Sequence, residues 1–307
     1  MSRRSDGPAG LLVVDKPGGI TSHDVVARVR RFARTRRVGH AGTLDPMATG
    51  VLVLGVNRAT RLLGHLTLTE KAYDATIRLG VTTTTDDAEG EPLDTADASR
   101  LDEQRVRSAL GDLVGDIAQV PSSVSAVKVD GRRAYQRVRA GEEFALPARP
   151  VTVHAIDVHA LHRHERTLDV EVSVRCSSGT YVRALARDTG AALGVGGHLT
   201  ALRRTAVGPF DLGDARPLES LEQELGLLGL DAVAARCFPT CRVDADQARA
   251  VAVGRTLDLD VTRDRDPATD RSPTGGRPVA LLDPAGHFLA LYEQRGAQAF
   301  PVAVFAG

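Results

Sequence analysis

The segment from Val38 to Gly55, VGHAGTLDPMATGVLVLG, constrains the fold more than any other stretch of the chain. Its first part is rich in glycine and turn-forming residues, which suits a tight turn and lets another backbone or a ligand approach closely. Residues 51–56 are an apolar run of the length of a strand. One acid, Asp45, lies in the turn, and Pro46 stiffens the chain directly after it. The sequence therefore predicts a rigid loop that presents one carboxylate and continues into a buried strand.

The triplet L-D-P alone is a common turn, because Asp can bond its own backbone and Pro fixes φ. The longer string GHAGTLDPMATG, residues 39–50, is more specific. It resembles the catalytic loop of the bacterial tRNA pseudouridine synthases that modify uridine 55 in the T-loop. The usual pattern there is GHTGTLDPxATG, so Ala41 replaces a threonine. The resemblance implies that Asp45 is the single essential aspartate of that family.

Two further segments match motifs of the same family. DKPGG at residues 15–19 resembles its first motif, and the resemblance implies that Lys16 helps to shape the floor of the active site. KAY at residues 71–73 resembles a motif whose tyrosine stacks on the target base, and Tyr73 holds that position. A half-buried tyrosine on a strand is the commoner role of such a residue.

A later segment, GTYVR at residues 179–183, resembles a family motif in which the arginine pairs with the catalytic aspartate and the tyrosine borders the pocket. The resemblance assigns these roles to Arg183 and Tyr181. It also assigns Leu202 to packing on the uracil, and His40 to the space that the target base leaves. A loop histidine bonded to backbone explains His40 equally well.

The segment from residue 121 to about 150 resembles the loop with which the family grips RNA, although Val124 stands where a tyrosine is usual. Charge is segregated in a way that suits such a partner. Residues 1–61 carry eleven Lys or Arg against four Asp or Glu, a balance of +7, and residues 69–120 have a balance of −7. This pattern favours a one-sided electrostatic surface for RNA, although a charge run is by default only a solvated face.

Length and composition indicate an ordinary soluble globular protein of 307 residues, with 25% charged and 42% hydrophobic residues. No apolar run approaches the length of a membrane span, so we expect no membrane partner. We interpret the three cysteines as reduced packing residues and expect a cytoplasmic monomer. The sequence shows no nucleotide-binding glycine motif and no Cys/His cluster, so no cofactor and no metal site are predicted.

Apolar periodicity predicts how helices and strands alternate along the chain. Ser22 is the expected cap of a helix after the DKPGG motif, and Thr180 of a helix that ends near Leu193. Residues 218–230 are expected to be helical. Strands are expected at residues 10–15, 71–79, 151–159, 168–176 and 199–207, and near the C-terminus at 256–261, 279–283, 288–291 and 302–305.

These elements predict an α+β protein with a mixed, largely antiparallel central sheet flanked by helices, the fold of the pseudouridine synthases. Residues 1–9 are expected to be a flexible basic N-terminus and residues 10–237 the catalytic domain. Residues 240–307 resemble a small RNA-binding β-barrel of the PUA type, and a plain small β-domain is nearly as good an interpretation.

Pseudouridine formation breaks the glycosidic bond, turns the base and rejoins it through carbon, without a redox change. A lone carboxylate can add to the uracil ring or to the sugar, or take a proton from the sugar. We expect Arg183 to lower the pKa of Asp45, since an opposite charge favours the ionised form. Three alternatives are a synthase for another RNA, a non-catalytic RNA-binding protein of the same fold, and a glycosidase-like enzyme. The last usually needs a second carboxylate.

Overall fold

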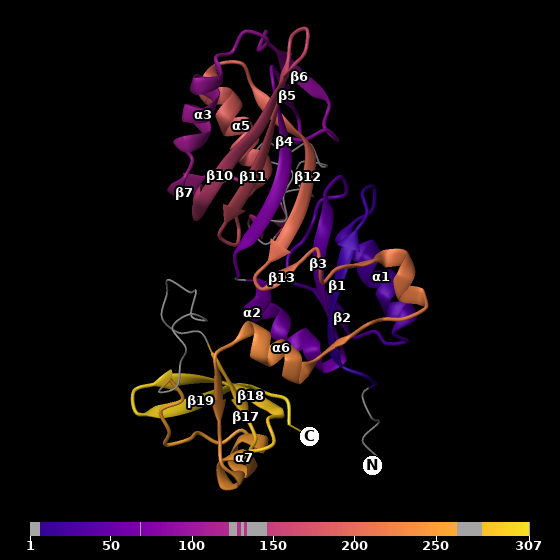
Figure 1. Cartoon of the computed structure of the whole chain (residues 1–307), viewed down its shortest axis with the longest axis vertical. Helices are drawn as coiled ribbons and strands as arrows, with labels where there is room; N and C mark the ends of the chain where they lie inside the picture. The colour runs from indigo at the N-terminus through magenta and orange to yellow at the C-terminus, as the bar shows by residue number, and fades with distance from the viewer. Residues whose placement is uncertain are drawn as a thin grey trace.

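The computed structural model describes residues 7–67, 69–122, 128–129, 132–133, 146–262 and 278–306. Most of the predicted RNA-gripping loop, most of the basic N-terminus and the polar stretch 263–277 therefore lie outside the described residues. Within the described residues, Figure 1 shows the large sheet in the upper part of the molecule and a second, smaller sheet at the bottom.

The central sheet is mixed and largely antiparallel, as predicted. In spatial order its main strands are β14 (Arg216–Pro217), β1 (Gly10–Lys16), β3 (Thr49–Val56), β12 (Gly197–Val207), β4 (Lys71–Leu79), β11 (Leu168–Cys176), β10 (Arg149–Arg163) and β7 (Gly115–Gln119). Three short strands attach to its sides: β2 (Val38–His40) on β3, β13 (Phe210–Asp211) on β12, and β15 (Leu228–Gly229) on β1. Among the described pairs of this central sheet, β1–β14 and β3–β12 are parallel.

The contact between β3 and β12 joins two halves of this sheet. The described ladder is short there and pairs Arg203 with Thr49 and Arg204 with Gly50. Gly50 has a φ of 97°, and a Cβ at this position would lie 2.2 Å from the carbonyl oxygen of Arg204. Only glycine permits this close approach. The glycine that ends the predicted loop is therefore also what lets the two halves of the sheet meet.

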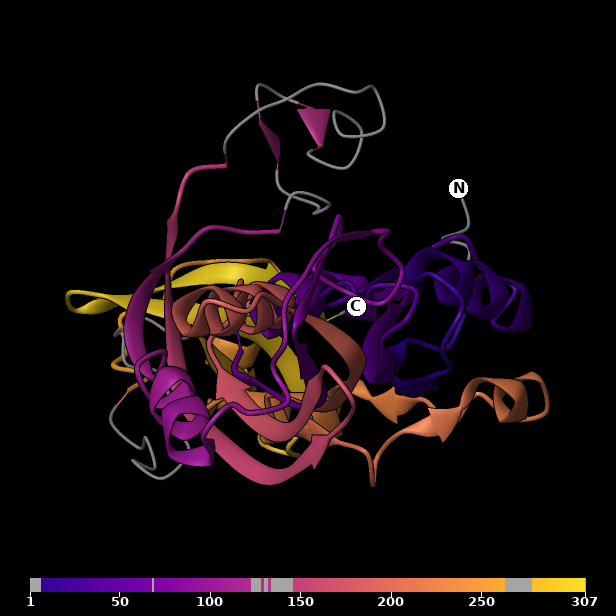
Figure 2. The same ribbon diagram turned by 90° about the horizontal axis from the view of Figure 1, so that it is seen from above.

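Helices cover one face of both halves. α1 (Ser22–Phe32) packs Val25 and Val29 over the β1–β3 half, and α3 (Glu103–Gly111) and α5 (Val182–Leu193) cover the other half. Figures 1 and 2 show α1 and α3 on opposite sides of the molecule. The second face of the β1–β3 half is covered by η1 (Asn57–Leu62), α2 (Leu63–Thr67) and α6 (Leu230–Cys237). The second face of the β4–β11 half is polar: β4 alternates buried with exposed or half-buried residues.

The C-terminal strands form a separate four-stranded sheet of β16 (Thr240–Arg242), β17 (Val279–Leu282), β18 (Phe288–Arg295) and β19 (Gln298–Val304), with α7 (Ala245–Ala252) beside it. In the described residues this sheet is open, so the predicted barrel is not confirmed. Phe288 and Leu291 of β18, and Phe305 directly after β19, belong to the same apolar cluster as Leu62 and Phe238. The smaller sheet therefore shares a core with the larger one.

Several predicted details are wrong. Thr21, not Ser22, caps α1, through a capping box with Asp24. The cap position of α5 is Tyr181, and the Thr180 hydroxyl donates to the carbonyl of Ser177 instead. The stretch 218–230 holds a short 3-10 helix, η2 (Leu218–Glu222), and then β15. At 256–261 the described backbone makes an isolated bridge between Leu257 and Ala299 rather than a strand. A hairpin of β5 (Val81–Thr83) and β6 (Pro92–Thr95) occupies part of the acidic segment.

Candidate active site

A cavity of about 380 Å³ opens between the two halves of the sheet, on the face that carries α1 and α5. Its walls come from several segments: the loop at 42–45, Thr67 at the end of α2, β4 at Lys71 and Tyr73, residues 178–183, and β12 at Leu202 and Arg204. A pocket of this size is typical of small-ligand sites. Five of the predicted site residues line it: Asp45, Tyr73, Tyr181, Arg183 and Leu202.

The loop that carries Asp45 is held rigidly at its base. The buried Ser22 hydroxyl accepts from the Leu44 amide at 2.8 Å and donates to the Leu44 carbonyl at 3.0 Å. The ammonium group of Lys16 donates to the carbonyls of Pro17, Ile20 and Pro46. Burial lowers the pKa of Lys16 to about 8. Lys16 thus ties the DKPGG segment to the loop, although it is not among the described residues that line the cavity.

Arg183 links Asp45 to a second carboxylate that the sequence analysis missed. Its guanidinium is 4% exposed, and its Nε lies 3.1 Å from Oδ2 of Asp45. Its Nη1 lies 3.3 Å from Oδ2 of Asp87 and donates to the Thr85 carbonyl at 2.9 Å. Asp87 is 2% exposed, and its Oδ1 accepts from the Thr85 hydroxyl. Asp87 lies in the acidic segment 69–120, but its position beside Arg183 could not be read from the spacing.

Arg183 lowers the pKa of Asp45, as expected, but the net shift is upward. Burial raises the pKa of Asp45 above its ordinary value, and Asp87 adds to this effect. The guanidinium of Arg183, with smaller help from Lys16 and Arg204, opposes the rise without cancelling it. A like charge nearby disfavours ionisation for the same reason that an opposite charge favours it. Asp45 is therefore a stronger base than an ordinary aspartate carboxylate.

Tyr73 and Tyr181 lie on different walls of the cavity. Tyr73 is buried on β4, where its partner in the neighbouring strand is Arg204. Burial raises the pKa of Tyr73, and the positive charge of Arg204 opposes the rise. The backbone of Tyr181 is fixed on both sides by the side chain of Gln119, which accepts from its amide at 2.8 Å and donates to its carbonyl at 3.1 Å. Gln119 is a further residue that sequence reasoning missed.

Two buried cations of the cavity were also missed. Arg204 is 1% exposed and reaches under the catalytic loop, and Lys71 donates to the carbonyls of Thr67 and Thr69. Burial lowers the pKa of Lys71 to about 8. Lysine and arginine are rarely buried so fully unless their charge is used or satisfied. The positive potential of the cavity thus comes from more groups than Arg183.

The structure does not place His40 among the described residues that line the cavity. His40 lies on β2, and its ring meets the edge of the His23 ring at 5.6 Å between centroids, with an interplanar angle of 81°. His23 belongs to α1. The two imidazoles form a polar rim next to the start of the catalytic loop.

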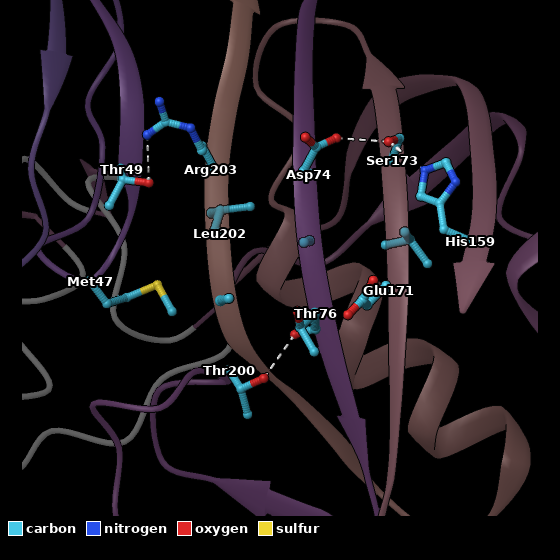
Figure 3. Close-up of a pocket in the computed structure, with 13 residues that line it drawn as sticks. Met47, Thr49, Asp74, Thr76, His159, Glu171, Ser173, Thr200, Leu202 and Arg203 are labelled. Atoms are coloured by element: carbon cyan, nitrogen blue, oxygen red, sulfur yellow. Dashed lines mark hydrogen bonds between the residues drawn. The ribbon is translucent and has the colours of Figure 1, made fainter. Parts of the chain in front are cut away.

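A second cavity, of about 560 Å³, lies on the open polar face of the sheet (Figure 3). Leu202 borders both cavities. Here Ser173 lies between His159 and Asp74, with its Oγ 2.7 Å from Nε2 of His159 and donating to Asp74 at 2.7 Å. A nucleophilic triad needs the histidine between serine and aspartate. This order of contacts therefore does not activate the serine.

Among the described residues, no group of three or more His, Cys, Asp or Glu is placed to hold a metal ion. In the same parts of the chain, no helix is long and apolar enough to cross a membrane.

Comparison with known proteins gives a consistent result along the chain. Residues 30–182 match the N-terminal domain of the TruB family of pseudouridylate synthases. Residues 183–229 match the C-terminal domain of tRNA pseudouridylate synthase B, and residues 238–306 the C-terminal part of tRNA pseudouridine synthase II. The chain is 58% identical to tRNA pseudouridine synthase B of Rhodococcus jostii over 96% of this chain and 93% of that one. The same enzyme of Streptomyces coelicolor is 55% identical, over 99% and 100%.

Solved structures agree on the fold. An H/ACA RNP bound to a substrate RNA containing 2'-deoxyuridine gives a TM-score of 0.70 at 23% identity, covering 97% of this chain and 85% of that one. A Cbf5-Nop10-Gar1 complex gives 0.68 at 23% identity, covering 99% and 90%. The architecture is therefore conserved between chains that differ at most positions.

Proposed function

This chain belongs to the TruB family of pseudouridylate synthases, and on that basis we propose that it isomerises uridine 55 in the T-loop of tRNA to pseudouridine. The observation that carries the proposal is the contact of 3.1 Å between Arg183 and Asp45 in a cavity bordered by a buried tyrosine. This arrangement supplies one oriented carboxylate, one cation and one aromatic wall. An isomerisation without redox change needs no more than these from the protein.

Asp45 is the proposed catalytic residue. Covalent addition to the uracil ring, covalent addition to the sugar and removal of a proton from the sugar all require its ionised form. A carboxylate with a raised pKa is a better base and nucleophile than an ordinary one, provided that it is ionised at the working pH. Arg183 serves both needs, because its charge favours ionisation and its buried position fixes the direction of the carboxylate.

The uridine has to leave its stack to reach this cavity, which costs a few kcal/mol. Stacking on the ring of Tyr73 would return about 1–3 kcal/mol. Leu202, on the neighbouring strand β12, would pack on the base next to Tyr73. Lys16 would keep the floor rigid, and Tyr181 would border the entrance. His40, on the rim beside His23, is then placed to contact the RNA from which the base has turned out.

The rest of the chain would bind the folded RNA by its backbone and shape. The end of α1 and the turn after it carry the exposed arginines Arg28, Arg30, Arg31, Arg34, Arg36 and Arg37. We assign catalysis to residues 10–237, RNA gripping to the loop at about 121–150, and remote RNA contact to the PUA-like part at 240–307. We expect a monomer that acts on tRNA in the cytoplasm, without a cofactor.

A glycosidase-like reaction is the candidate from another class, and Asp87 is the second carboxylate that it would need. Asp87 is poorly suited to that task. Its side chain is buried against Arg183 and Thr85, so it is not free to activate a water molecule. A non-catalytic RNA-binding protein would have no use for the pair of Asp45 with the buried Arg183, because a buried guanidinium is costly to desolvate.

The test is to incubate the protein with unmodified tRNA and to map pseudouridines by chemical sequencing, with Asp45→Asn as the matched control. We expect one new pseudouridine, at position 55, in the wild-type reaction alone. Modification at a different position would identify a synthase for another site. A lack of pseudouridine in every tRNA would refute the proposed activity.

A further inference from the structure

Arg204 makes contacts that join the two ends of the catalytic loop. Its Nη2 donates to the Gly42 carbonyl at 3.1 Å and its Nη1 to the Thr43 carbonyl at 3.3 Å, on the side of the loop before Asp45. Its Nε donates to the Val51 carbonyl at 2.7 Å, after the loop. One guanidinium therefore spans both ends of the segment that presents Asp45.

The same residue also connects the loop to the aromatic wall. Its backbone pairs with Tyr73 of β4 on one side and with Gly50 of β3 on the other, and its side chain lines the same cavity as Tyr73. Asp45 and Tyr73 come from different halves of the sheet, and the described β3–β12 ladder between those halves is short. The Arg204 side chain reinforces this junction directly beneath the cavity.

We propose that Arg204 is a positioning residue that holds the Asp45 carboxylate in a fixed place relative to the Tyr73 ring. The inference rests on the proposed function, because Tyr73 matters for turnover only if a base stacks there. Arginine suits the task, since its fork offers five N–H donors in fixed directions. A lysine could satisfy the Gly42 side or the Val51 side but cannot span them.

The neighbouring arginine shows that the sheet junction has a second anchor with a different role. Arg203 points to the open face, where it reaches Thr49 (Figure 3) and forms a bidentate pair with Asp15 at 3.0 and 2.7 Å. Those contacts join β12 to β3 and β1. The contacts of Arg204 are made instead to the two ends of the loop, so its loss should disturb the loop in particular.

Arg204 also affects the loop through its charge, which favours the ionised form of Asp45. Geometry and charge can be separated by two substitutions. Arg204→Lys keeps a cation but loses the span, and Arg204→Met loses both. A matched control is Arg78→Met, which breaks a bidentate pair with Asp169 on the same strand as Tyr73, roughly 16 Å away at ~3.3 Å per residue.

The experiment measures single-turnover pseudouridine formation against pH, tRNA affinity, and hydrogen exchange of the amides at 42–50. In both Arg204 variants we expect the rate to fall by roughly 100-fold, the loss that a misplacement of about 1 Å can cause. Affinity should stay within about twofold, because phosphate contacts dominate it. The loop amides should exchange faster. The acid limb of the pH–rate profile should move up in Arg204→Met only, because the pKa of Asp45 rises when the cation is lost.

The inference is overturned if Arg204→Met keeps the wild-type rate, if affinity falls in step with the rate, or if Arg78→Met slows turnover as much. If Arg204→Met does not fold, Arg204→Lys decides the question by its rate and its loop exchange. The hydrogen-exchange measurement needs no tRNA, so it tests the role of Arg204 separately from the reaction. An inactive wild-type enzyme would refute the proposed function. Unchanged exchange of the loop amides in Arg204→Lys would refute the positioning role of Arg204.

Discussion

Phe305 tests whether the C-terminal sheet is an independent unit or part of one folding core. Its side chain is 4% exposed and lies in the apolar cluster that joins the two sheets. Its ring centroid is 5.0 Å from that of Phe288 in the smaller sheet, and 5.0 Å from the guanidinium carbon of Arg61 in η1. One ring thus contacts both parts of the chain.

Phe305→Ala should destabilise the protein by roughly 3 kcal/mol, the low end of the range of ~3–5 kcal/mol for a buried phenylalanine. We choose the low end because the site is next to the chain end and can partly collapse. The main-chain bonds at this position survive the change: its amide donates to Leu289, and its carbonyl accepts from Arg58. At ~2 °C per kcal/mol for a chain of this size, the melting temperature should fall by roughly 6 °C.

Hydrogen exchange at increasing urea, followed separately for peptides of β3 and of β18, distinguishes the two arrangements. With a shared core, Phe305→Ala should lower the urea concentration at the midpoint of unfolding equally for the β3 and the β18 peptides. Val302→Ala is the matched control, because Val302 lies on β19, just before Phe305, but is 42% exposed, and such surface changes stay within about 0.5 kcal/mol. A midpoint that falls for β18 while β3 keeps the wild-type value would refute the shared core.

Three other predictions follow from the site. Asp45→Asn should abolish turnover in the pseudouridine assay while changing tRNA affinity by less than about tenfold. The variant should also be more stable than the wild type in thermal melts, because folding raises the pKa of Asp45. This gain should be absent below pH 3.8, the ordinary pKa of an aspartate, and should grow as pH rises through the raised pKa of Asp45. Asp87→Asn should move the acid limb of the pH–rate profile down, because the charge of Asp87 raises the pKa of Asp45. Affinity for tRNA should fall with log salt by roughly 0.7–0.9 per phosphate contact, and salt-independent titrations would assign the +7 balance of residues 1–61 to a solvated surface.

The sequence was most informative where a motif is continuous. The loop 39–50 and the motifs at 71–73 and 179–183 identified Asp45, Tyr73 and Arg183 as candidates, and these residues do lie together. Strict alternation in 168–176 predicted β11 correctly. The mixed sheet followed from the elements and from the resemblance.

The residues that sequence reasoning missed act across strands. Arg204 is significant because β12 places it between Gly50 and Tyr73, and that register is set by packing rather than by local pattern. Asp87 stands in an acidic run that looks solvated, and only the fold brings it to Arg183. Ser22 was expected to cap α1, but the equally suitable Thr21 took that role and left the Ser22 hydroxyl to hold Leu44. Local sequence patterns thus predicted candidate side chains, whereas tertiary packing determined which residues each of them contacts.

The buried charges of the active site reduce the stability of the fold, and the shared apolar core compensates for them. Lys16, Arg183 and Arg204 are all buried at one junction, together with Asp87. Each buried charge carries a desolvation penalty that its partners only partly offset. For Lys16, this burial lowers the pKa to about 8. The junction itself has a short ladder between β3 and β12 and therefore adds little. Stabilisation must come from apolar clusters on either side, one of which includes the C-terminal sheet. Asp45→Asn, which removes a charge that burial disfavours, should therefore favour folding and oppose turnover. Loss of Arg183 or Arg204 would instead leave buried partners unpaired and weaken the fold as well. Substitutions in the apolar cluster shared by the two sheets should weaken the fold without touching the chemistry.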